Sequence, residues 1–172
     1  MTLYVDLLAQ ANMLAICDPG KPKQANLRRA VSAAYYSIFH LFVSEGASVM
    51  GSKLSAIART RLRRAFGHGQ MKEVCSKYFA ATTAASFTLQ IAPLLSFPLD
   101  VKLKSVAGVF VDMQEARHAA DYDVSTKLTR IDVLSMIADV EAAIPDWKSI
   151  RKTDNAKVFL IDMLMRKAWA RA

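Results

Sequence analysis

The chain has 172 residues, of which 53% are hydrophobic, and a formal net charge of +8. This length suits one domain with a core large enough to fold without cross-links. Acidic residues keep every apolar run below the ~18 to 20 residues of a membrane-spanning helix, and the first residues lack the basic start and cleavage site of a secretory signal. We therefore expect a soluble, cytoplasmic protein that does not associate with membranes.

The two cysteines predict neither a disulfide framework nor a zinc site. Cys17 and Cys75 stand alone, without a CxxC or Cys/His spacing, so both are expected to be reduced thiols. Gly-rich phosphate loops, HExxH, GxSxG, calcium loops and kinase signatures are also absent from the sequence. We expect no metal and no cofactor, and the common enzyme classes built on these motifs lose support.

The first half of the chain predicts three helices. Apolar residues recur at three- and four-residue steps over 3–16, which is typical of an amphipathic helix. Residues 25–45 contain no Gly or Pro and predict a long second helix, and the segment 46–52 predicts a break. Residues 53–66 predict a basic helix that stops at the Gly-His-Gly sequence of 67–69.

The second half predicts further helices and one irregular connection. Residues 70–85 favour a helix, whereas Pro93 and Pro98 favour an irregular apolar segment over 86–98. Asp100 is the expected N-cap of a helix that ends near Asp121.

Capping residues delimit the last two predicted helices. Thr129 and Asp132 have the spacing of a capping box, for a helix that Ile144-Pro145 bends or stops after about Ala143. Asp154 is expected to cap the final helix, which has one apolar face formed by Val158, Ile161, Met165 and Trp169. No segment has a strand pattern, so the sequence predicts an all-α bundle with an additional C-terminal helix.

Basic residues concentrate in two segments. Residues 53–64 contain Lys53, Arg59, Arg61, Arg63 and Arg64 and no acid. Residues 148–172 contain seven basic and two acidic residues, a net charge of +5. Such clusters favour polyanions, RNA above all, through counterion release and electrostatic steering. A solvated basic surface is the alternative that charge alone leaves open.

One face of the second predicted helix combines three functional side chains. Arg29, Tyr36 and His40 are separated by seven and four residues, which places them on one narrow face of an α-helix. This set combines a phosphate-binding cation, a phenol and an imidazole that titrates near neutrality. In the alternative interpretation, Tyr36 and His40 are satisfied residues at the edge of the core.

A dense polar segment, residues 115–123, closes the helix that begins after Asp100. Arg117 and Asp121 are four residues apart and can form an ion pair. An acid at a helix C-terminus meets the negative end of the dipole, so Asp121 needs a donor such as Arg117. A purely structural ion pair is the alternative to a functional site.

Three blocks of this sequence resemble the HEPN superfamily of small helical bundles. They are residues 26–40 (NLRRAVSAAYYSIFH), 68–70 (HGQ) and 116–123 (ARHAADYD), in that order. The match spans about 3–143. The resemblance implies an antiparallel bundle of four to five helices over 1–145, usually a homodimer, that handles RNA in toxin-antitoxin, antiphage or stress systems. Residues 146–172 then form a basic helical extension that packs on the bundle, extends the dimer or engages a partner.

The resemblance also implies a catalytic chemistry. Active members of the superfamily resemble metal-independent ribonucleases in which an Arg and a His on the later helix meet their symmetry mates across the dimer. Arg117 matches the Arg. Tyr122 stands where the His is expected, and a phenol with a pKa near 10 is a poor base at neutral pH. His40, His68 or His118 could supply the imidazole instead.

The sequence thus predicts an RNA-binding protein, with metal-independent RNA cleavage as its candidate activity. Arg117, His40 and Tyr122 are the candidate catalytic residues. A non-catalytic interaction module of a defence complex is the alternative, and a nucleotidyltransferase-type antitoxin is a candidate partner, with Tyr122 as the target of modification. RNA or a nucleotide is expected to contact Arg29, Tyr36, Arg59, Arg61, Arg63, Arg64 and His68.

Overall fold

The computed structural model describes residues 2–51 and 53–169, with side chains as far as Arg166. Over these residues the chain is all-α, as predicted. The predictions on the side chains of Lys167, Trp169 and Arg171 fall outside the described part. None of the described helices is both long and apolar enough to cross a bilayer. The elements are α1 (Leu3–Ile16), α2 (Gln24–Gly51), α3 (Ala56–Arg64), α4 (His68–Ala80), the 3-10 helices η1 (Ala84–Ser86) and η2 (Ala92–Leu94), α5 (Val101–Tyr122), α6 (Arg130–Ile150) and α7 (Asp154–Trp169).

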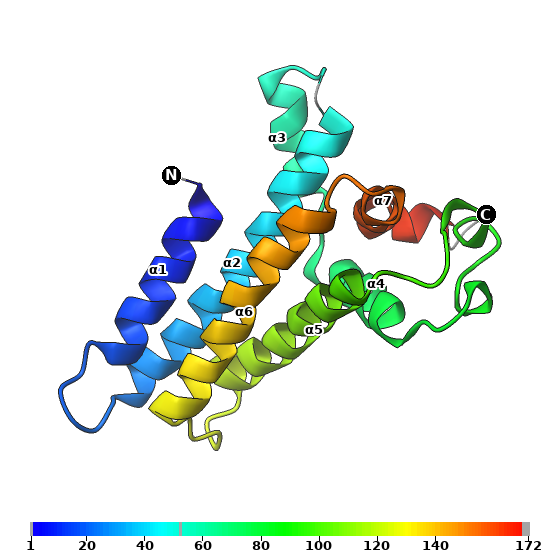
Figure 1. The fold of residues 1–172 in the computed structure, drawn as a ribbon. Coiled ribbons are helices and arrows are strands. Elements are labelled where there is room, and N and C mark those ends of the chain that lie inside the picture. Colours follow the sequence, from blue (N-terminus) through cyan, green and yellow to red (C-terminus); the bar gives the residue numbers. More distant parts are fainter. Residues whose placement is uncertain (1, 52, 170–172) are drawn as a thin grey trace. The chain divides into compact units, whose positions relative to one another are not determined.

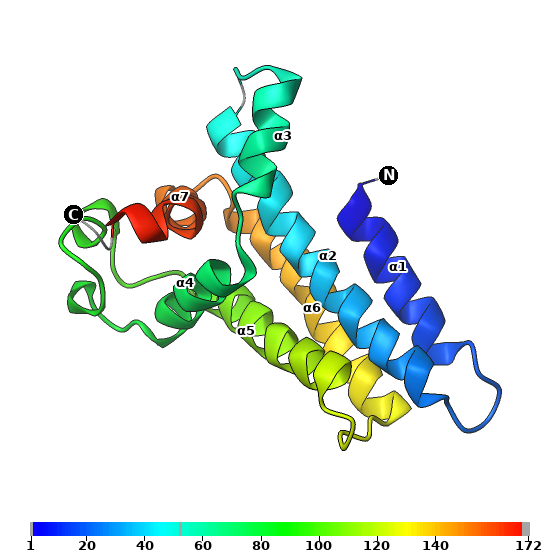
Figure 2. The ribbon, with the colours of Figure 1, turned by 180° about the vertical axis from the view of Figure 1, so that it is seen from behind.

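The chain divides into two compact units. Unit 1 comprises Met1–Leu41 and Val109–Pro145, and unit 2 comprises Phe42–Gly108 and Asp146–Ala172. Within unit 1, α1, the first part of α2, the last part of α5 and the first part of α6 lie side by side and alternate in direction (Figures 1 and 2). Their buried faces carry the apolar residues that make helix packing favourable, including Leu27, Ile38, Phe110, Val133 and Ile137.

Local hydrogen bonds hold the helix ends of unit 1. Thr129 and Asp132 form the predicted capping box, because the Asp132 amide donates to the Thr129 hydroxyl at 3.2 Å and the Thr129 amide donates to the Asp132 carboxylate at 3.3 Å. Arg130 donates to the carbonyl oxygens of Ala15, Asp18 and Gly20. The α1–α2 connection is therefore tied to the start of α6.

An aromatic cluster fills the core of unit 2. The ring of Phe159 in α7 lies 5.4 Å from Phe42, 4.8 Å from Tyr78 and 6.0 Å from Trp147, measured between ring centroids. All four rings are fully buried. Asp100 caps α5 as predicted, since its carboxylate accepts from the Lys102 amide at 2.7 Å.

The predicted break at residues 46–52 is wrong, because α2 continues to Gly51. Gly46 lies inside the helix, where the absence of a Cβ admits the buried ring of Phe66. The glycine therefore permits a close approach between two segments, and it does not end the helix.

Alanine at this position is expected to destabilise unit 2. A Cβ on Gly46 would overlap Cζ of the buried Phe66, whereas a Cβ on Gly108 would lie 2.9 Å from Phe79, whose residue is 55% exposed and can turn away. We expect Gly46→Ala to lower the free energy of unfolding by about 1 to 2 kcal/mol. This is a net value, because the gain in helix propensity offsets part of the cost of the overlap. Gly108→Ala is the matched control: its helix-propensity gain of about 1 kcal/mol is opposed by the cost of moving Phe79, so the expected net change is below about 0.5 kcal/mol. Chemical denaturation measures both, and equal effects would contradict the packing argument.

Three predicted boundaries also differ from the structure. The helix α6 continues through Pro145 to Ile150, because Trp147 and Ile150 are buried beyond it and the proline itself is exposed. Thr153 caps α7 in place of Asp154, since its hydroxyl accepts from the Ala156 amide at 3.3 Å. The helix α4 spans His68–Ala80, so His68 is its first residue.

Unit 2 also buries a carboxyl group. Asp162 of α7 has no exposed surface, and neither carboxylate oxygen has a hydrogen-bond partner among the described residues. The guanidinium of Arg166 lies 4.0 Å from the Asp162 carboxylate and itself pairs with Glu73 at 2.8 Å. Burial raises the pKa of Asp162 to about 6 from its ordinary value of 3.8.

This raised pKa predicts a loss of stability with rising pH. The unfolded chain releases the proton of Asp162 near pH 4, whereas the folded state keeps it up to about pH 6. The free energy of unfolding therefore falls as the pH rises from about 4 to 6, and it does not recover at higher pH. We expect Asp162→Asn to be more stable than the wild type by about 1 to 3 kcal/mol at pH 8, and by less at pH 4.5. Urea unfolding at the two pH values, with the exposed Asp139→Asn as control, measures this. A stability difference between Asp162→Asn and the wild type that is the same at both pH values would contradict the raised pKa of Asp162.

Candidate functional site

A polar cluster forms where α2 and α5 face each other in unit 1. Nε of Arg117 lies 2.6 Å from Oδ2 of Asp121, one turn further along α5. The other oxygen of Asp121 accepts from the Ser32 hydroxyl of α2 at 2.8 Å. An ion pair and one hydrogen bond therefore hold the carboxylate that faces the negative end of the helix dipole.

Aromatic rings surround the guanidinium of Arg117. Its Nη2 donates to the Tyr36 hydroxyl at 3.5 Å, and its Cζ lies 5.7 Å from the centroid of the Tyr36 ring. The rings of Tyr35 and Tyr122 lie 5.9 Å and 5.6 Å away. These distances are within the range of cation–π attraction, so three tyrosines fix the position of one cation.

The cluster holds Arg117 in its charged form. Burial lowers the pKa of the guanidinium, but the neighbouring Tyr36 and Asp121 outweigh this, so the pKa lies above its ordinary value. The Arg117 side chain retains 21% of its exposure and Asp121 retains 18%. A permanent cation with limited solvent access is suited to an anionic group that enters from one side.

His40 lies one turn beyond Tyr36 on α2. The two rings are 6.3 Å apart and stacked. Since Ser32 faces Asp121 and Tyr36 faces Arg117, the same antiparallel register places His40 level with Met113. Burial lowers the pKa of His40 below its ordinary value of 6.5, so the imidazole is neutral at pH 7 and available as a proton acceptor.

Tyr122 connects the cluster to the surface. Its residue is 65% exposed, and its ring lies 5.0 Å from that of His118, which is also exposed. The Tyr122 ring thus lies close to both the Arg117 guanidinium and the His118 imidazole. One phenol is therefore near an imidazole and a guanidinium, whose residues are neighbours in sequence and project from α5 about 100° apart.

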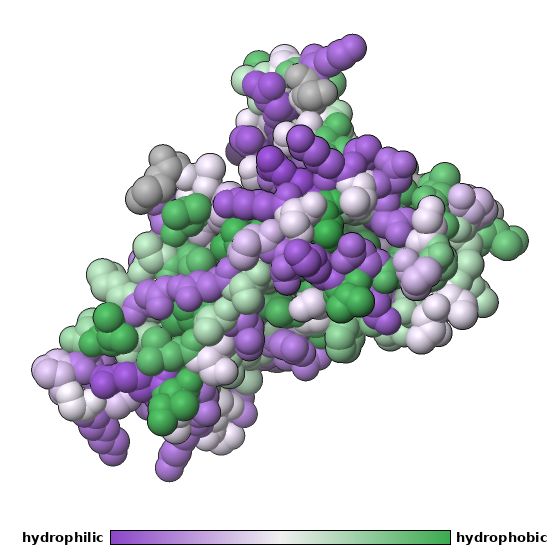
Figure 3. Space-filling view, in the orientation of Figure 1, coloured by the Kyte–Doolittle hydropathy of each residue, from purple (hydrophilic) through white to green (hydrophobic). Residues whose placement is uncertain are grey.

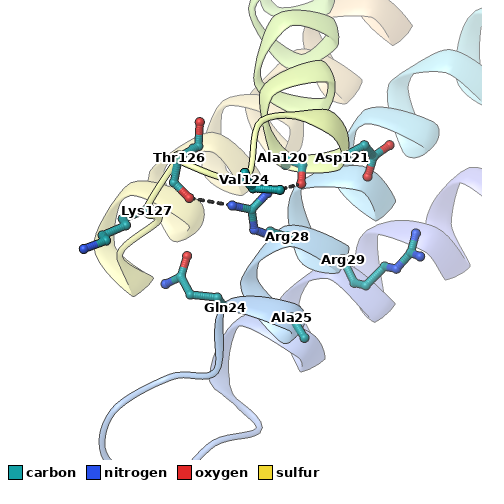
Figure 4. A pocket seen from close by; sticks show the side chains of 9 residues that line it. All are labelled: Gln24, Ala25, Arg28, Arg29, Ala120, Asp121, Val124, Thr126 and Lys127. Atoms are coloured by element: carbon teal, nitrogen blue, oxygen red, sulfur yellow. Dashed lines mark hydrogen bonds between the residues drawn. The ribbon is translucent and has the colours of Figure 1, made fainter.

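An open pocket of ≈ 590 Å³ adjoins the cluster, and Asp121 belongs to both. In Figure 4 Arg29 and Asp121 lie on one side of Arg28, and Lys127 extends to the other. The exposed Arg29 therefore lies at the rim next to the polar cluster. The lining residues are Gln24, Ala25, Arg28, Arg29, Ala120, Asp121, Val124, Thr126 and Lys127.

Sequence reasoning selected Arg29 and missed its neighbour Arg28. The Arg28 guanidinium donates to the carbonyl oxygens of Ala120 and Thr126, both at 2.6 Å (Figure 4), and to that of Asp123 at 3.0 Å. It thereby satisfies carbonyls at the C-terminus of α5, where a cation is favourable. The spacing of four residues from Arg28 to Ser32, and again to Tyr36, could have indicated that Arg28 faces α5.

The loop after α5 is ordered by a second carboxylate. Asp123 accepts from the amide and hydroxyl of Ser125 and from the hydroxyl of Thr126. These hydrogen bonds, first that of the Ser125 side chain, lower the pKa of Asp123 to about 2. The loop is thus fixed at neutral pH in the form that presents its carbonyls to Arg28.

The remaining predicted residues lie in unit 2. Arg59, Arg61, Arg63 and Arg64 belong to α3, and His68 begins α4. Polar side chains gather around α3 in Figure 3, with apolar residues between them. Two of the apolar residues are exposed to a large extent, Leu54 by 43% and Ile57 by 71%. Among the described residues no group of three His, Cys, Asp or Glu side chains could hold a metal ion.

Comparisons with family models, with curated proteins and with solved structures find no match to this chain.

Proposed function

We propose that this chain is an RNA-binding protein similar to the HEPN superfamily, and that RNA contacts unit 1 at the polar cluster of α2 and α5. The observation that supports this most is the position of Arg117, a cation held by Asp121 and Tyr36 beside the exposed ring of Tyr122. A guanidinium binds a phosphate, and an exposed tyrosine ring stacks on an unpaired base. The net charge of +8 favours the approach of RNA.

Metal-independent RNA cleavage is the activity that we propose for this cluster. The neutral imidazole of His40 takes the proton of a ribose 2′-hydroxyl, whose oxygen attacks the neighbouring phosphorus. The bond from phosphorus to the 5′ oxygen breaks, and that oxygen takes up a proton from water. Arg117 stabilises the charge that develops on the phosphorane. In this proposal the protein acts as a homodimer, in which the symmetry-related clusters share one substrate.

Total RNA incubated with the purified protein in EDTA tests the proposal. The wild type is compared with Arg117→Ala and His40→Ala, and products are separated on a denaturing gel. Cleavage by the wild type that both substitutions abolish supports the ribonuclease. Salt-sensitive binding without cleavage supports an RNA-binding module. If the wild type neither binds nor cleaves RNA, the proposal is wrong.

One observation favours the alternative function. Arg117 already pairs with Asp121 and Tyr36 within its own chain, which suits a scaffold as well as a binding site. The alternative is a non-catalytic partner subunit of a toxin-antitoxin or antiphage complex. Adenylylation or a similar modification of the exposed Tyr122 by a nucleotidyltransferase-type partner, detected by mass spectrometry, would support it.

A further inference from the structure

A second pocket lies in unit 2, between the last turns of α2 and one face of α3. Its volume is ≈ 440 Å³. Arg59 and Arg63 are four residues apart and therefore project from the same side of α3. The pocket is lined by these two arginines and by Ser44, Ala47, Ser48 and Gly51 of α2.

The small residues of α2 create this pocket. A Cβ on Gly51 would lie 3.1 Å from Cγ of Arg59, so the glycine lets the stem of the arginine cross the end of α2 closely. Ser55 caps α3, because its hydroxyl accepts from the Ala58 amide at 3.3 Å. The cap and this close contact hold the start of α3, and thus Arg59, beside α2.

The pocket offers hydrogen-bond donors and no carboxylate. Among the described residues neither Arg59 nor Arg63 forms an ion pair, and the hydroxyls of Ser44 and Ser48 make no hydrogen bond. The neighbouring acid on α2, Glu45, pairs with Arg151 at 3.1 Å. Two guanidiniums and two hydroxyls without an internal acceptor are complementary to a phosphate group.

The opposite face of α3 provides a contrast. Arg61 and Arg64 line a smaller pocket of ≈ 290 Å³ with Ala56, Ile57 and Thr60. The Thr60 hydroxyl already donates to the carbonyl of Ala56 at 3.0 Å. This face has the same charge and no hydroxyl that is free to donate to an anion, so the two faces of one helix differ in their ability to coordinate phosphate.

We propose that Arg59, Arg63, Ser44 and Ser48 form a phosphate-binding pocket in unit 2, and that a backbone phosphate of single-stranded RNA is its ligand. Only the identity of the ligand rests on the proposed function. The preference for phosphate follows from the donors themselves. The four arginines of α3 are therefore not equivalent, and the pair on the pocket face contributes more to binding.

Inorganic phosphate tests the pocket without RNA. In NMR spectra that resolve the arginine Nε–H groups, phosphate is expected to shift Arg59 and Arg63 along a saturable curve and to leave Arg61 and Arg64 nearly unchanged. Ser44→Ala/Ser48→Ala, which changes no charge, should weaken this binding several-fold. Equal shifts of all four arginines, or no saturation, would overturn the proposal.

A fluorescent single-stranded RNA then tests the ligand. Arg59→Gln/Arg63→Gln keeps the aliphatic stems and is expected to weaken binding at least tenfold and to lower the slope of log affinity against log salt by about 0.7 to 1.4. Arg61→Gln/Arg64→Gln removes the same charge and should weaken binding less than threefold. Equal losses would overturn RNA as the ligand of the pocket. If the wild type binds phosphate but no RNA, the pocket stands and the proposed function fails.

Discussion

Replacing Arg117 by Ala is expected to lower the rate of RNA cleavage by about 10²- to 10³-fold, the usual loss when one donor to a developing oxyanion is removed. RNA affinity should fall by roughly tenfold, because a charged hydrogen bond is lost. Single-turnover cleavage and fluorescence anisotropy measure the two effects. Arg151→Ala is the matched control, since it also removes one arginine and one ion pair, that with Glu45.

A second comparison separates contact with RNA from scaffolding. Arg117→Lys keeps the charge but not the planar group that reaches Asp121 and Tyr36 together, so its activity should lie between the wild type and Arg117→Ala. Asp121→Asn breaks the same ion pair and leaves the guanidinium in place. If Arg117 is only structural, Asp121→Asn and Arg117→Ala should cost similar stability and neither should change RNA affinity. That result would contradict our proposal.

Phe159→Ala is expected to cause the largest loss of stability among the substitutions considered, about 3 to 5 kcal/mol. The fully buried ring packs against Phe42, Tyr78 and Trp147, which belong to three other helices. Its removal leaves a cavity in the core of unit 2, because the neighbouring large rings cannot move into the space without losing their own contacts.

Guanidinium chloride unfolding followed by tryptophan fluorescence measures this effect, since Trp147 lies in the same cluster. Phe79→Ala is the matched control, because that residue is 55% exposed, and its cost should stay below about 1 kcal/mol. Phe159→Leu should lie between the two. A cost of less than about 1.5 kcal/mol for Phe159→Ala would show that the cluster is not a close-packed core.

Several elements of the fold could be predicted because their signals are local. The caps at Asp100 and Thr129 depend on side chains within three residues of the helix start, so the sequence contains the whole interaction. The spacing of Arg117 and Asp121 likewise indicates a pair within one helix. Helical periodicity alone was sufficient for the all-α class.

Two of the predictions that failed depend on partners far away in the sequence. A glycine such as Gly46 favours a break by its own propensity, but the ring of Phe66, twenty residues later, packs on it and keeps the helix continuous. Pro145 favours a helix end, but the burial of Trp147 and Ile150 stabilises a helix that continues beyond the proline. In both cases the free energy of tertiary burial exceeds the local preference.

The sequence by itself therefore determined the fold class, the helix starts with strong caps, and the pairing of Arg117 with Asp121 at the end of α5. Only the tertiary structure decided which residues of different helices meet. It joins Tyr36 to Arg117 across α2 and α5, turns Arg28 to the end of α5, and places Arg59 and Arg63 beside the small residues of α2. The physical reason is that periodicity defines the faces of a single helix, whereas the register between helices depends on side-chain packing over the whole core.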